Sequence, residues 1–319
     1  MNWFEGSKEY YGANWFAAME KAYPERWQCF RGEANSATLV KRSPTPERVA
    51  VIISGGGSDG PLLPSFVGEG LADACVVGAP YSAPNAYALY EAGKHLGREK
   101  GVLFLYNNFA GDFLNNDMAM ELLTLEGFCV ESVAVSDDMG MAIGEPRENR
   151  GGRCALPWLI KLAAACAAKG LSLAETAALV RKANERAVTL CLTVDQARKE
   201  ISFGNGFSGE PGFRVETHMD IQRTAEETAE MLLGDVKPRA DEALYLLVNR
   251  LRLTSYADSY HMAWRMHNIL AARHEVACMR VGAFSNILDV YGYTFTVLCA
   301  DSSLRPYLGG TVCTDSVML

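Results

Sequence analysis

The sequence predicts an α/β fold with two domains, the first a doubly wound, largely parallel sheet and the second a smaller α/β domain. Buried-strand signals alternate with helical stretches between residues 49 and 135, a spacing typical of βαβ units. The chain has 319 residues, enough for two domains, and its composition becomes glycine-rich after residue 200. We therefore expect an N-terminal domain over residues 1–195 and a C-terminal domain over residues 196–319.

The first domain is expected to open with a helix and to continue as alternating strands and helices. Apolar residues share one face of a helix over residues 15–23, which Pro24 ends. The further expected strands lie over 49–53, 74–77, 102–106 and 129–135. One expected helix covers 86–95, and another follows the loop after the strand at 102–106 and ends at residue 126. Ligands of open α/β sheets bind past the carboxyl ends of such strands, so we expect the site there.

The rest of the chain predicts further helices and strands around a glycine-rich bend. Ser172 with Glu175, and Thr224 with Glu227, match the capping box that begins a helix. The glycine-rich residues 201–212 predict a sharp loop. The other expected elements are a helix over 158–169, strands over 243–248, 277–281 and 293–298, and a helix over 256–273.

Composition excludes several classes of function. A net charge of −8 argues against a nucleic-acid or anionic-membrane partner, because phosphate groups repel an acidic surface. No apolar run is long enough to span a bilayer, and the N-terminal residues lack the pattern of a signal peptide. The nine cysteines are scattered and form no C-x-x-C pair, which indicates reduced thiols rather than disulfides or a zinc site. We expect a cytoplasmic protein without a metal site.

The strand at residues 49–53 runs directly into a glycine-rich loop, Ser-Gly-Gly-Gly-Ser-Asp-Gly, at residues 54–60. Glycine has no side chain to shield the backbone, so such a loop can present bare N–H groups to a ligand. The loop matches neither G-x-G-x-x-G nor G-x-x-x-x-G-K-[ST], and it therefore supports neither a dinucleotide nor a Walker-type triphosphate site. Taken alone, it fits a tight turn as well as a ligand loop.

Several motifs in order along the chain resemble one family. They are the Ser-Gly-Gly-Gly-Ser loop (54–58), Phe-Val-Gly-Glu-Gly (66–70), Asn-Phe-Ala-Gly-Asp-Phe-Leu-Asn (108–115), Asp137-Asp138, and Gly-Asn-Gly-Phe-Ser-Gly-Glu-Pro-Gly (204–212). Their order and spacing resemble the substrate-binding K subunit of dihydroxyacetone kinase, which also forms the first domain of the ATP-dependent enzymes. The likeness extends over about residues 15–300.

The resemblance implies a small sugar as ligand and a second subunit as partner. The K subunit of that family is usually a homodimer and traps a short ketose on a histidine. Its nucleotide and magnesium ions lie on a separate L subunit or domain. For this chain we therefore expect a short ketose or polyol as ligand and no cofactor of its own, with ATP or ADP and Mg²⁺ on an L-type partner.

The resemblance also assigns residues. The family's aspartate corresponds to Asp112, and a carboxylate there can accept the proton of the hydroxyl being phosphorylated. Substrate contacts fall on Gly56, Gly57, Ser58, Asp59, Gly60, Ala83, Asn107 and Ser208. Ala83 stands where the family usually has a serine, and Asn107 replaces a lysine. The pair Asp137 and Asp138 is expected to be structural.

Both histidines of the family are absent from their motifs. Gly60 stands roughly where the first belongs, and Ser208 replaces the second. A serine hydroxyl cannot form the nitrogen-linked adduct, and without an activating base it is a poor nucleophile. We therefore expect no covalent capture of the ketose. His218, ten residues beyond Ser208, is assigned to a surface or loop.

Three functions remain open on these residues. The first is a kinase subunit that holds a ketose or polyol through loop amides, Asn107 and Ser208, with Asp112 as the base. The second is a catalytically inactive relative, a sugar sensor or co-activator that passes its signal to a regulator. The third is an enzyme of another reaction on a sugar or sugar phosphate. The family resemblance supports the first, whereas the loss of the histidines together with the retained glycine loops favours the second.

Overall fold

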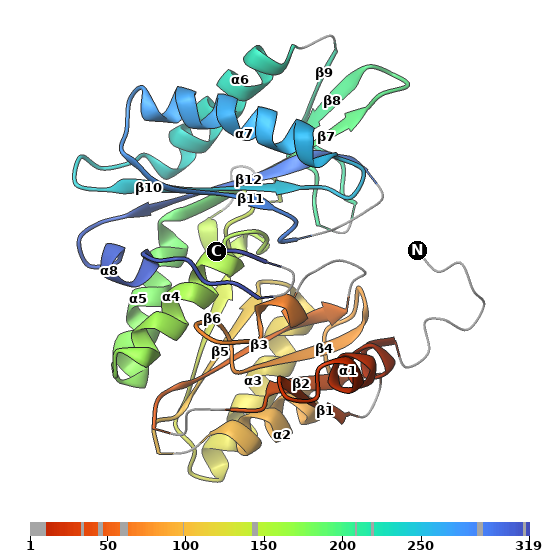
Figure 1. Cartoon of the computed structure of the whole chain (residues 1–319), viewed down its shortest axis with the longest axis vertical. Helices are drawn as coiled ribbons and strands as arrows, with labels where there is room; N and C mark the ends of the chain where they lie inside the picture. Colours follow the sequence, from red (N-terminus) through yellow and green to blue (C-terminus); the bar gives the residue numbers. More distant parts are fainter. Residues whose placement is uncertain are drawn as a thin grey trace. The chain divides into compact units, whose positions relative to one another are not determined.

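The first sheet is built around the apolar strands that the sequence predicts. The computed structural model describes residues 11–32, 35–43, 47–57, 63–97, 99–141, 146–207, 209–217, 220–285, 290–314 and 317–319. The strands of this sheet are β1 (Trp27–Arg31), β2 (Ala37–Lys41), β3 (Ala50–Gly57), β4 (Ala74–Pro80), β5 (Val102–Asn107) and β6 (Val130–Val135). They run in the order β1-β2-β4-β3-β5-β6 (Figure 1).

The centre of this sheet is parallel, as predicted. Strand β3 pairs in parallel with β4 on one side and β5 on the other, so that Ile52 lies opposite both Ala74 and Phe104. Strands β1 and β2, which the sequence analysis does not anticipate, add an antiparallel edge. The carboxyl ends of β3, β4 and β5 therefore meet at one edge of the sheet.

Helices cover both faces of this sheet. The helices are α1 (Tyr11–Ala22), α2 (Ala86–Leu96), α3 (Ala110–Leu125), α4 (Leu156–Ala168) and α5 (Leu173–Glu185), with short 3₁₀ turns η1 (Leu63–Phe66) and η2 (Arg147–Asn149). Helix α1 packs on β1, β2 and β4, whereas α2 and α3 pack together and on the central strands. The buried side chains of Leu89, Phe104 and Leu123 join α2, β5 and α3 in one core. Each such side chain contributes about 1.5–3 kcal/mol when buried, which fixes α3 against β5.

The second sheet is mostly antiparallel. Its strands are β7 (Ala187–Asp195), β8 (Glu200–Phe203), β9 (Arg214–Thr217), β10 (Ala243–Arg250), β11 (Val276–Gly282) and β12 (Tyr291–Ala300), and the remaining helices are α6 (Ile221–Val236), α7 (Tyr256–Ala271) and α8 (Arg305–Leu308). The strand order is β11-β10-β12-β7-β8-β9, and only β10 and β11 pair in parallel among the pairs described. Helices α6 and α7 pack side by side on this sheet (Figure 1).

The chain divides differently from the expected boundary between residues 195 and 196. One compact unit holds residues 1–134, 159–181 and 310–317, and the other holds 135–158, 182–309 and 318–319. Strand β7, expected in the first domain, instead pairs with β12 and β8 of the second sheet. Both sheets have six strands.

Two local expectations for the second unit are also corrected. Part of the expected loop at residues 201–212 is strand β8, which forms a ladder with β9. The prediction that Thr224 and Glu227 form a capping box is wrong. Asp220 caps α6 instead, and its Oδ1 accepts from the Arg223 N–H at 2.9 Å. Thr224 lies inside the helix, where its hydroxyl donates to the Asp220 carbonyl.

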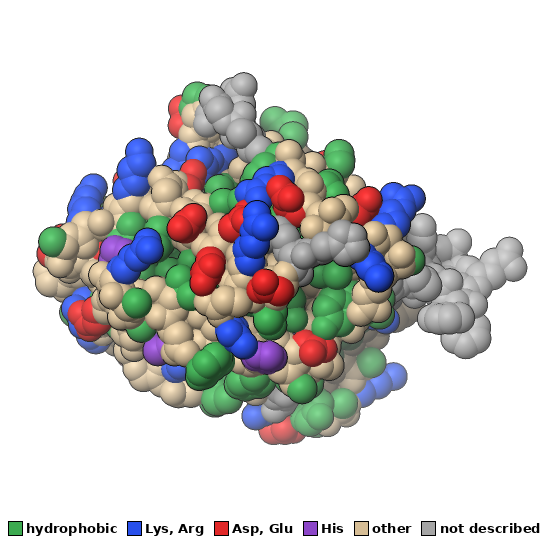
Figure 2. Space-filling view, turned by 90° about the horizontal axis from the view of Figure 1, so that it is seen from above, with side chains coloured by type: hydrophobic (Ala, Val, Ile, Leu, Met, Phe, Trp, Pro, Cys, Tyr) green, Lys and Arg blue, Asp and Glu red, His purple; other side chains and the backbone are tan. Residues whose placement is uncertain are grey.

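The surface mixes charges of both signs. On the face seen in Figure 2, basic and acidic side chains are interspersed with apolar ones. None of the helices in the described part of the chain combines the length and the apolar character that a membrane span requires.

Candidate functional site

At the carboxyl ends of the central strands, the backbone of glycine residues lies next to Asp112. Strand β3 ends in Gly55, Gly56 and Gly57. A β-carbon placed on Gly55 would lie 4.0 Å from Asp112 Oδ1, and one placed on Gly56 would lie 3.1 Å from the Ser82 backbone nitrogen. The end of β3 therefore lies against the first turn of α3 and the loop that follows β4. A side chain at Gly56 would crowd that loop.

The loop after β4 completes this edge. A β-carbon on Gly111 would lie 3.2 Å from the β-carbon of Ala83, which places Ala83 against the start of α3. Tyr81, in the same loop, has a φ of 59°, a left-handed conformation that costs a residue with a side chain about 1–2 kcal/mol. Its ring is 60% exposed beside the edge. Sequence reasoning missed Tyr81, because neither its type nor its spacing signals a positive φ.

Asp112 is a buried carboxylate with an unused oxygen. It lies in the first turn of α3 and is only 7% exposed. Among the described residues, its Oδ1 has no hydrogen-bond partner. Burial raises the pKa of the Asp112 carboxyl from its ordinary value of 3.8 to about 7. Near neutral pH this carboxyl can therefore both hold and accept a proton.

A second unused acceptor lies five residues earlier. Asn107 ends β5, and its buried side-chain oxygen also has no partner among the described residues. The chain turns sharply here, because the Phe109 N–H donates to the Asn107 carbonyl at 2.8 Å. A buried acceptor without a donor costs about 1–3 kcal/mol. Two such acceptor oxygens at one edge of the sheet favour a ligand that donates hydrogen bonds.

A buried network holds the backbone of Asp112 in place. Asn116, one helical turn after Asp112, is fully buried, and its Nδ2 donates to the Asp112 carbonyl at 2.8 Å. The same Nδ2 donates to Ser54 Oγ on β3 at 3.0 Å. Asn116 therefore ties the first turn of α3 to the strand that carries the glycines. Sequence reasoning missed both Ser54 and Asn116, although Asn116 stands four residues after Asp112, on the same helix face.

Some predicted site residues lie outside the described part of the chain. These are Ser58, Asp59, Gly60 and Ser208, and His218 lies outside it as well. Gly56, Gly57, Ala83, Asn107 and Asp112 all lie in the first compact unit. Within the described ranges, no three histidine, cysteine, aspartate or glutamate side chains are grouped so that they could hold a metal ion.

The pair Asp137 and Asp138 has the structural role expected for it. The Asp137 carboxylate accepts hydrogen bonds from the backbone N–H groups of Arg153, Cys154 and Ala155 at 2.6, 3.1 and 2.8 Å. Asp138 forms an ion pair of 2.9 Å with the Arg153 guanidinium, and both side chains are fully buried.

Arg153 in turn fixes the start of the second glycine-rich segment. Its guanidinium donates to the backbone carbonyls of Asn205 and Gly206 and lies 5.8 Å from the centre of the Phe207 ring. The conformation of residues 205–207 therefore depends on a buried cation rather than on glycine alone. Nothing in the spacing of Arg153 signals this role, because the contact joins segments more than fifty residues apart.

Comparison with solved structures identifies the fold. A dihydroxyacetone kinase of C. freundii superposes with a TM-score of 0.86 at 21% identity, over 100% of this chain and 61% of that one. A structure titled "Regulation of the dha operon of Lactococcus lactis" gives 0.84 at 24% identity, over 92% and 91%. A dihydroxyacetone kinase operon co-activator gives 0.82 at 24%, over 93% and 95%. At these identities the likeness establishes the fold alone.

The match to a family model identifies the family, and the sequence relatives agree with it. The dihydroxyacetone-binding subunit DhaK of PTS-dependent dihydroxyacetone kinase 2 from Listeria innocua is 29% identical over 86% of this chain and 87% of its own length. The corresponding subunit from Lactococcus lactis is 28% identical over 82% of each chain. D-erythrulose kinase of Mycolicibacterium smegmatis is 28% identical over 82% of this chain and 48% of its own length. The Dak1 domain model matches residues 18–315, and this chain belongs to the Dak1 domain family.

Proposed function

We propose that this chain is a substrate-binding subunit of the dihydroxyacetone kinase type, which holds a short ketose or related polyol for phosphorylation by a separate subunit. The observation that supports the proposal is that Asn107 and Asp112 each carry a buried side-chain oxygen with no partner among the described residues, and that Asp112 lies beside the bare backbone of Gly55. A molecule with several hydroxyl groups supplies the donors that these oxygens lack. Backbone N–H groups of the glycine loop supply donors for its carbonyl oxygen.

The names of the relatives support a small ligand. They are named as kinases of dihydroxyacetone, of erythrulose and, in tomato, putatively of 3,4-dihydroxy-2-butanone. These compounds are ketones of three or four carbons with a hydroxyl beside the carbonyl. We propose a ligand of this class for the present chain.

Asp112 is proposed as the general base. A carboxyl whose pKa is raised to about 7 accepts a proton from a substrate hydroxyl more readily than an ordinary aspartate, because its basicity matches neutral pH. The proposed substrate contacts are Gly56, Gly57, Ser58, Asp59, Gly60, Ala83, Asn107 and Ser208. With Gly60 and Ser208 at the positions of the family's histidines, the ligand is held by hydrogen bonds rather than by a covalent adduct.

The phosphoryl donor is proposed to come from a partner. An L-type subunit would bind ATP or ADP with Mg²⁺, or receive the phosphoryl group from a phosphotransfer protein. We propose a homodimer as the working form of this chain and the cytoplasm as its location.

The test is reconstitution of phosphoryl transfer. The chain is mixed with an L-type subunit and either ATP and Mg²⁺ or a phosphotransfer protein, and ³¹P NMR follows conversion of dihydroxyacetone and erythrulose. Asp112→Asn is expected to lower turnover about 10²–10⁴-fold, the usual contribution of a general base. Glu91→Gln, on the exposed face of α2, is the matched control and is expected to leave turnover unchanged.

Two further measurements separate the alternatives. Intact mass after incubation with dihydroxyacetone is expected to stay unchanged, and a stable increase would overturn non-covalent binding. Calorimetric binding without turnover with either donor would instead identify a sugar-sensing regulator, which the absence of the family's histidines favours. Turnover without any donor would identify an enzyme of another reaction.

A further inference from the structure

Helix α3 buries one side and exposes a row of apolar side chains on another. Its inner side buries Asp112, Asn116, Ala119 and Leu123. Its outer side carries Leu114, Met118, Leu122 and Leu125, which are 63%, 56%, 38% and 84% exposed. Spacings of four, four and three residues place these four side chains in one row along the helix. A surface helix usually has a polar outer side, so this apolar row is suited to contact with another molecule.

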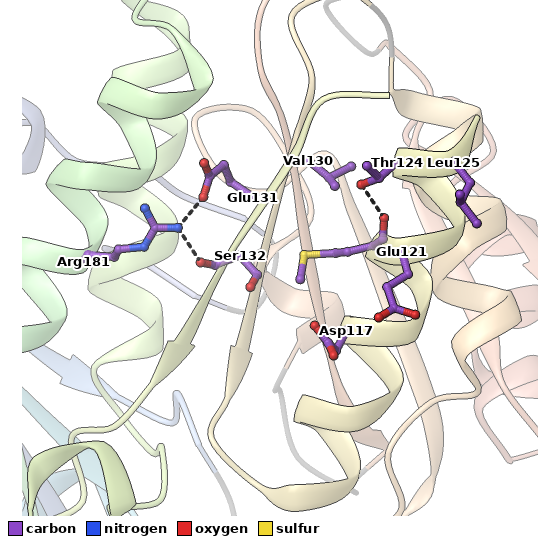
Figure 3. A pocket seen from close by; sticks show the side chains of 9 residues that line it. Asp117, Glu121, Thr124, Leu125, Val130, Glu131, Ser132 and Arg181 are labelled. Atoms are coloured by element: carbon purple, nitrogen blue, oxygen red, sulfur yellow. Dashed lines mark hydrogen bonds and ion pairs between the residues drawn. The ribbon is translucent and has the colours of Figure 1, made fainter. Parts of the chain in front are cut away.

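An acidic groove runs beside the apolar row. It has a volume of about 580 Å³ and lies between the second half of α3, strand β6 and Arg181 of α5 (Figure 3). Asp117 and Glu121 line it from α3, next to the row, and Glu131 lines it from β6. Met120 and Val130 provide apolar lining.

The charges of the groove do not cancel. Arg181, its one lining cation among the described residues, forms an ion pair with Glu131 and donates to the Ser132 carbonyl at 3.1 Å (Figure 3). No ion-pair partner is described for Asp117 or Glu121. The groove therefore keeps negative charge directly beside an exposed apolar row.

We propose that the outer side of α3 and this groove form a docking site for an amphipathic helix of a partner protein, with its apolar side on the row and lysine or arginine side chains in the groove. Charge complementarity selects this occupant. Lysine or arginine side chains would pair with Asp117 and Glu121, whereas an anionic membrane would be repelled by them.

The acidic end of the docking site lies far along α3 from Asp112, although the row begins at Leu114, two residues after it. Leu125 lies thirteen residues along α3 from Asp112, or about 20 Å at 1.5 Å per residue. A partner bound along this side of α3 would therefore contact the same helix that positions Asp112.

The test uses a model peptide and the full chain. An 18-residue helical peptide with a leucine side and a lysine side is titrated into the protein, and fluorescence anisotropy gives Kd. A peptide of the same leucine pattern with glutamate in place of lysine is the control. The lysine peptide is expected to bind at least tenfold more tightly than the glutamate peptide, and its binding is expected to weaken with salt.

Two variants assign binding to the named surface. Leu122→Asn combined with Leu125→Asn removes half of the row, and Asp117→Asn combined with Glu121→Gln removes the uncompensated charge. Each pair is expected to raise Kd at least tenfold, and the charge variant is also expected to abolish the salt dependence. Leu253→Asn, at another exposed leucine, is the matched control and is expected to leave Kd unchanged.

Several outcomes would overturn the proposal. Equal binding of the two peptides, no saturation at millimolar peptide, or unchanged Kd in both variants would each exclude this docking site. Sedimentation that shows self-association of the wild type, lost in the leucine variant, would assign the row to a second copy instead. If the leucine variant fails to fold, the charge variant alone decides, because its substitutions preserve side-chain size.

Discussion

Two buried aspartates, one in each compact unit, show why burial alone does not mark a functional acid. Asp137 is fully buried and accepts hydrogen bonds from three successive backbone N–H groups and from the Thr189 hydroxyl. Asp112 is almost as buried, but its Oδ1 has no partner among the described residues. The fold satisfies the first carboxylate, whereas the second keeps an oxygen that no described residue satisfies.

The difference has a local physical origin. Asp137 follows β6 and faces residues 153–155, whose N–H groups converge on it. Asp112 lies next to Gly55 at the end of β3, which has no side chain to donate a hydrogen bond. Asp137 therefore has hydrogen-bond donors around its carboxylate, whereas burial raises the pKa of Asp112 to about 7.

The largest effect is expected at Asp137. Asp137→Ala leaves three buried N–H groups without their acceptor and removes one of the two partners of the Thr189 hydroxyl, and each unsatisfied group costs about 1–3 kcal/mol. We expect a loss of at least about 3 kcal/mol in the free energy of unfolding, measured by urea denaturation of the purified chain. A loss below about 1 kcal/mol would show that the network contributes little and would remove the contrast with Asp112.

Asp112 is expected to destabilise the folded chain when its carboxyl ionises. Because its folded pKa is raised above the ordinary 3.8, the folded chain holds more protons than the unfolded chain between about pH 4 and pH 7. Stability therefore falls as the pH rises through this window and is level above it. At 1.36 kcal/mol per pKa unit, the fall reaches about 4 kcal/mol at most.

Asp112→Asn tests this directly, since an amide does not titrate. The difference in stability between the wild type and the variant is expected to shift in favour of the variant from pH 4 to pH 7, as measured by urea denaturation at several pH values. Parallel curves for the two proteins across this window would mean that Asp112 ionises normally, and the argument for its role as a base would lose its support.

The sequence predicts the elements whose signals are local. The apolar run at residues 50–53 and the glycines after it predict β3 and its sheet edge. The capping box at Ser172 and Glu175 is also confirmed, with the Ser172 N–H donating to Glu175 Oε2 at 2.9 Å and the Glu175 N–H donating to Ser172 Oγ at 3.3 Å. Each depends on residues close together in the chain.

The features that the sequence analysis misses depend on distant partners. Strand β7 belongs to the second sheet because β12, about a hundred residues later, pairs with it. Thr224 and Glu227 match a capping box, but Asp220 offers a better-placed acceptor one turn earlier. Asn116 is a further case, because its partner Ser54 is 62 residues away.

Asn116 provides the smallest expected effect and the most specific test of how Asp112 is held. Asn116→Ala removes the donor to the Asp112 carbonyl and leaves Ser54 without its partner, a loss of about 1–2 kcal/mol in the free energy of unfolding. Because the Asp112 backbone then loses its link to β3, turnover in the reconstituted kinase is expected to fall about tenfold.

The pH dependence distinguishes positioning from general destabilisation. If Asn116 only stabilises the fold, the variant keeps the wild-type pH profile of turnover once it is assayed well below its unfolding temperature. If it positions Asp112, the midpoint of the acid limb moves toward the ordinary aspartate pKa, because a looser first turn of α3 exposes the carboxyl to water. Asn116→Asp is expected not to restore turnover, because a carboxylate cannot donate to the Asp112 carbonyl. Asn116→Gln keeps the amide donor, and it restores turnover if the longer side chain reaches both the Asp112 carbonyl and Ser54 Oγ.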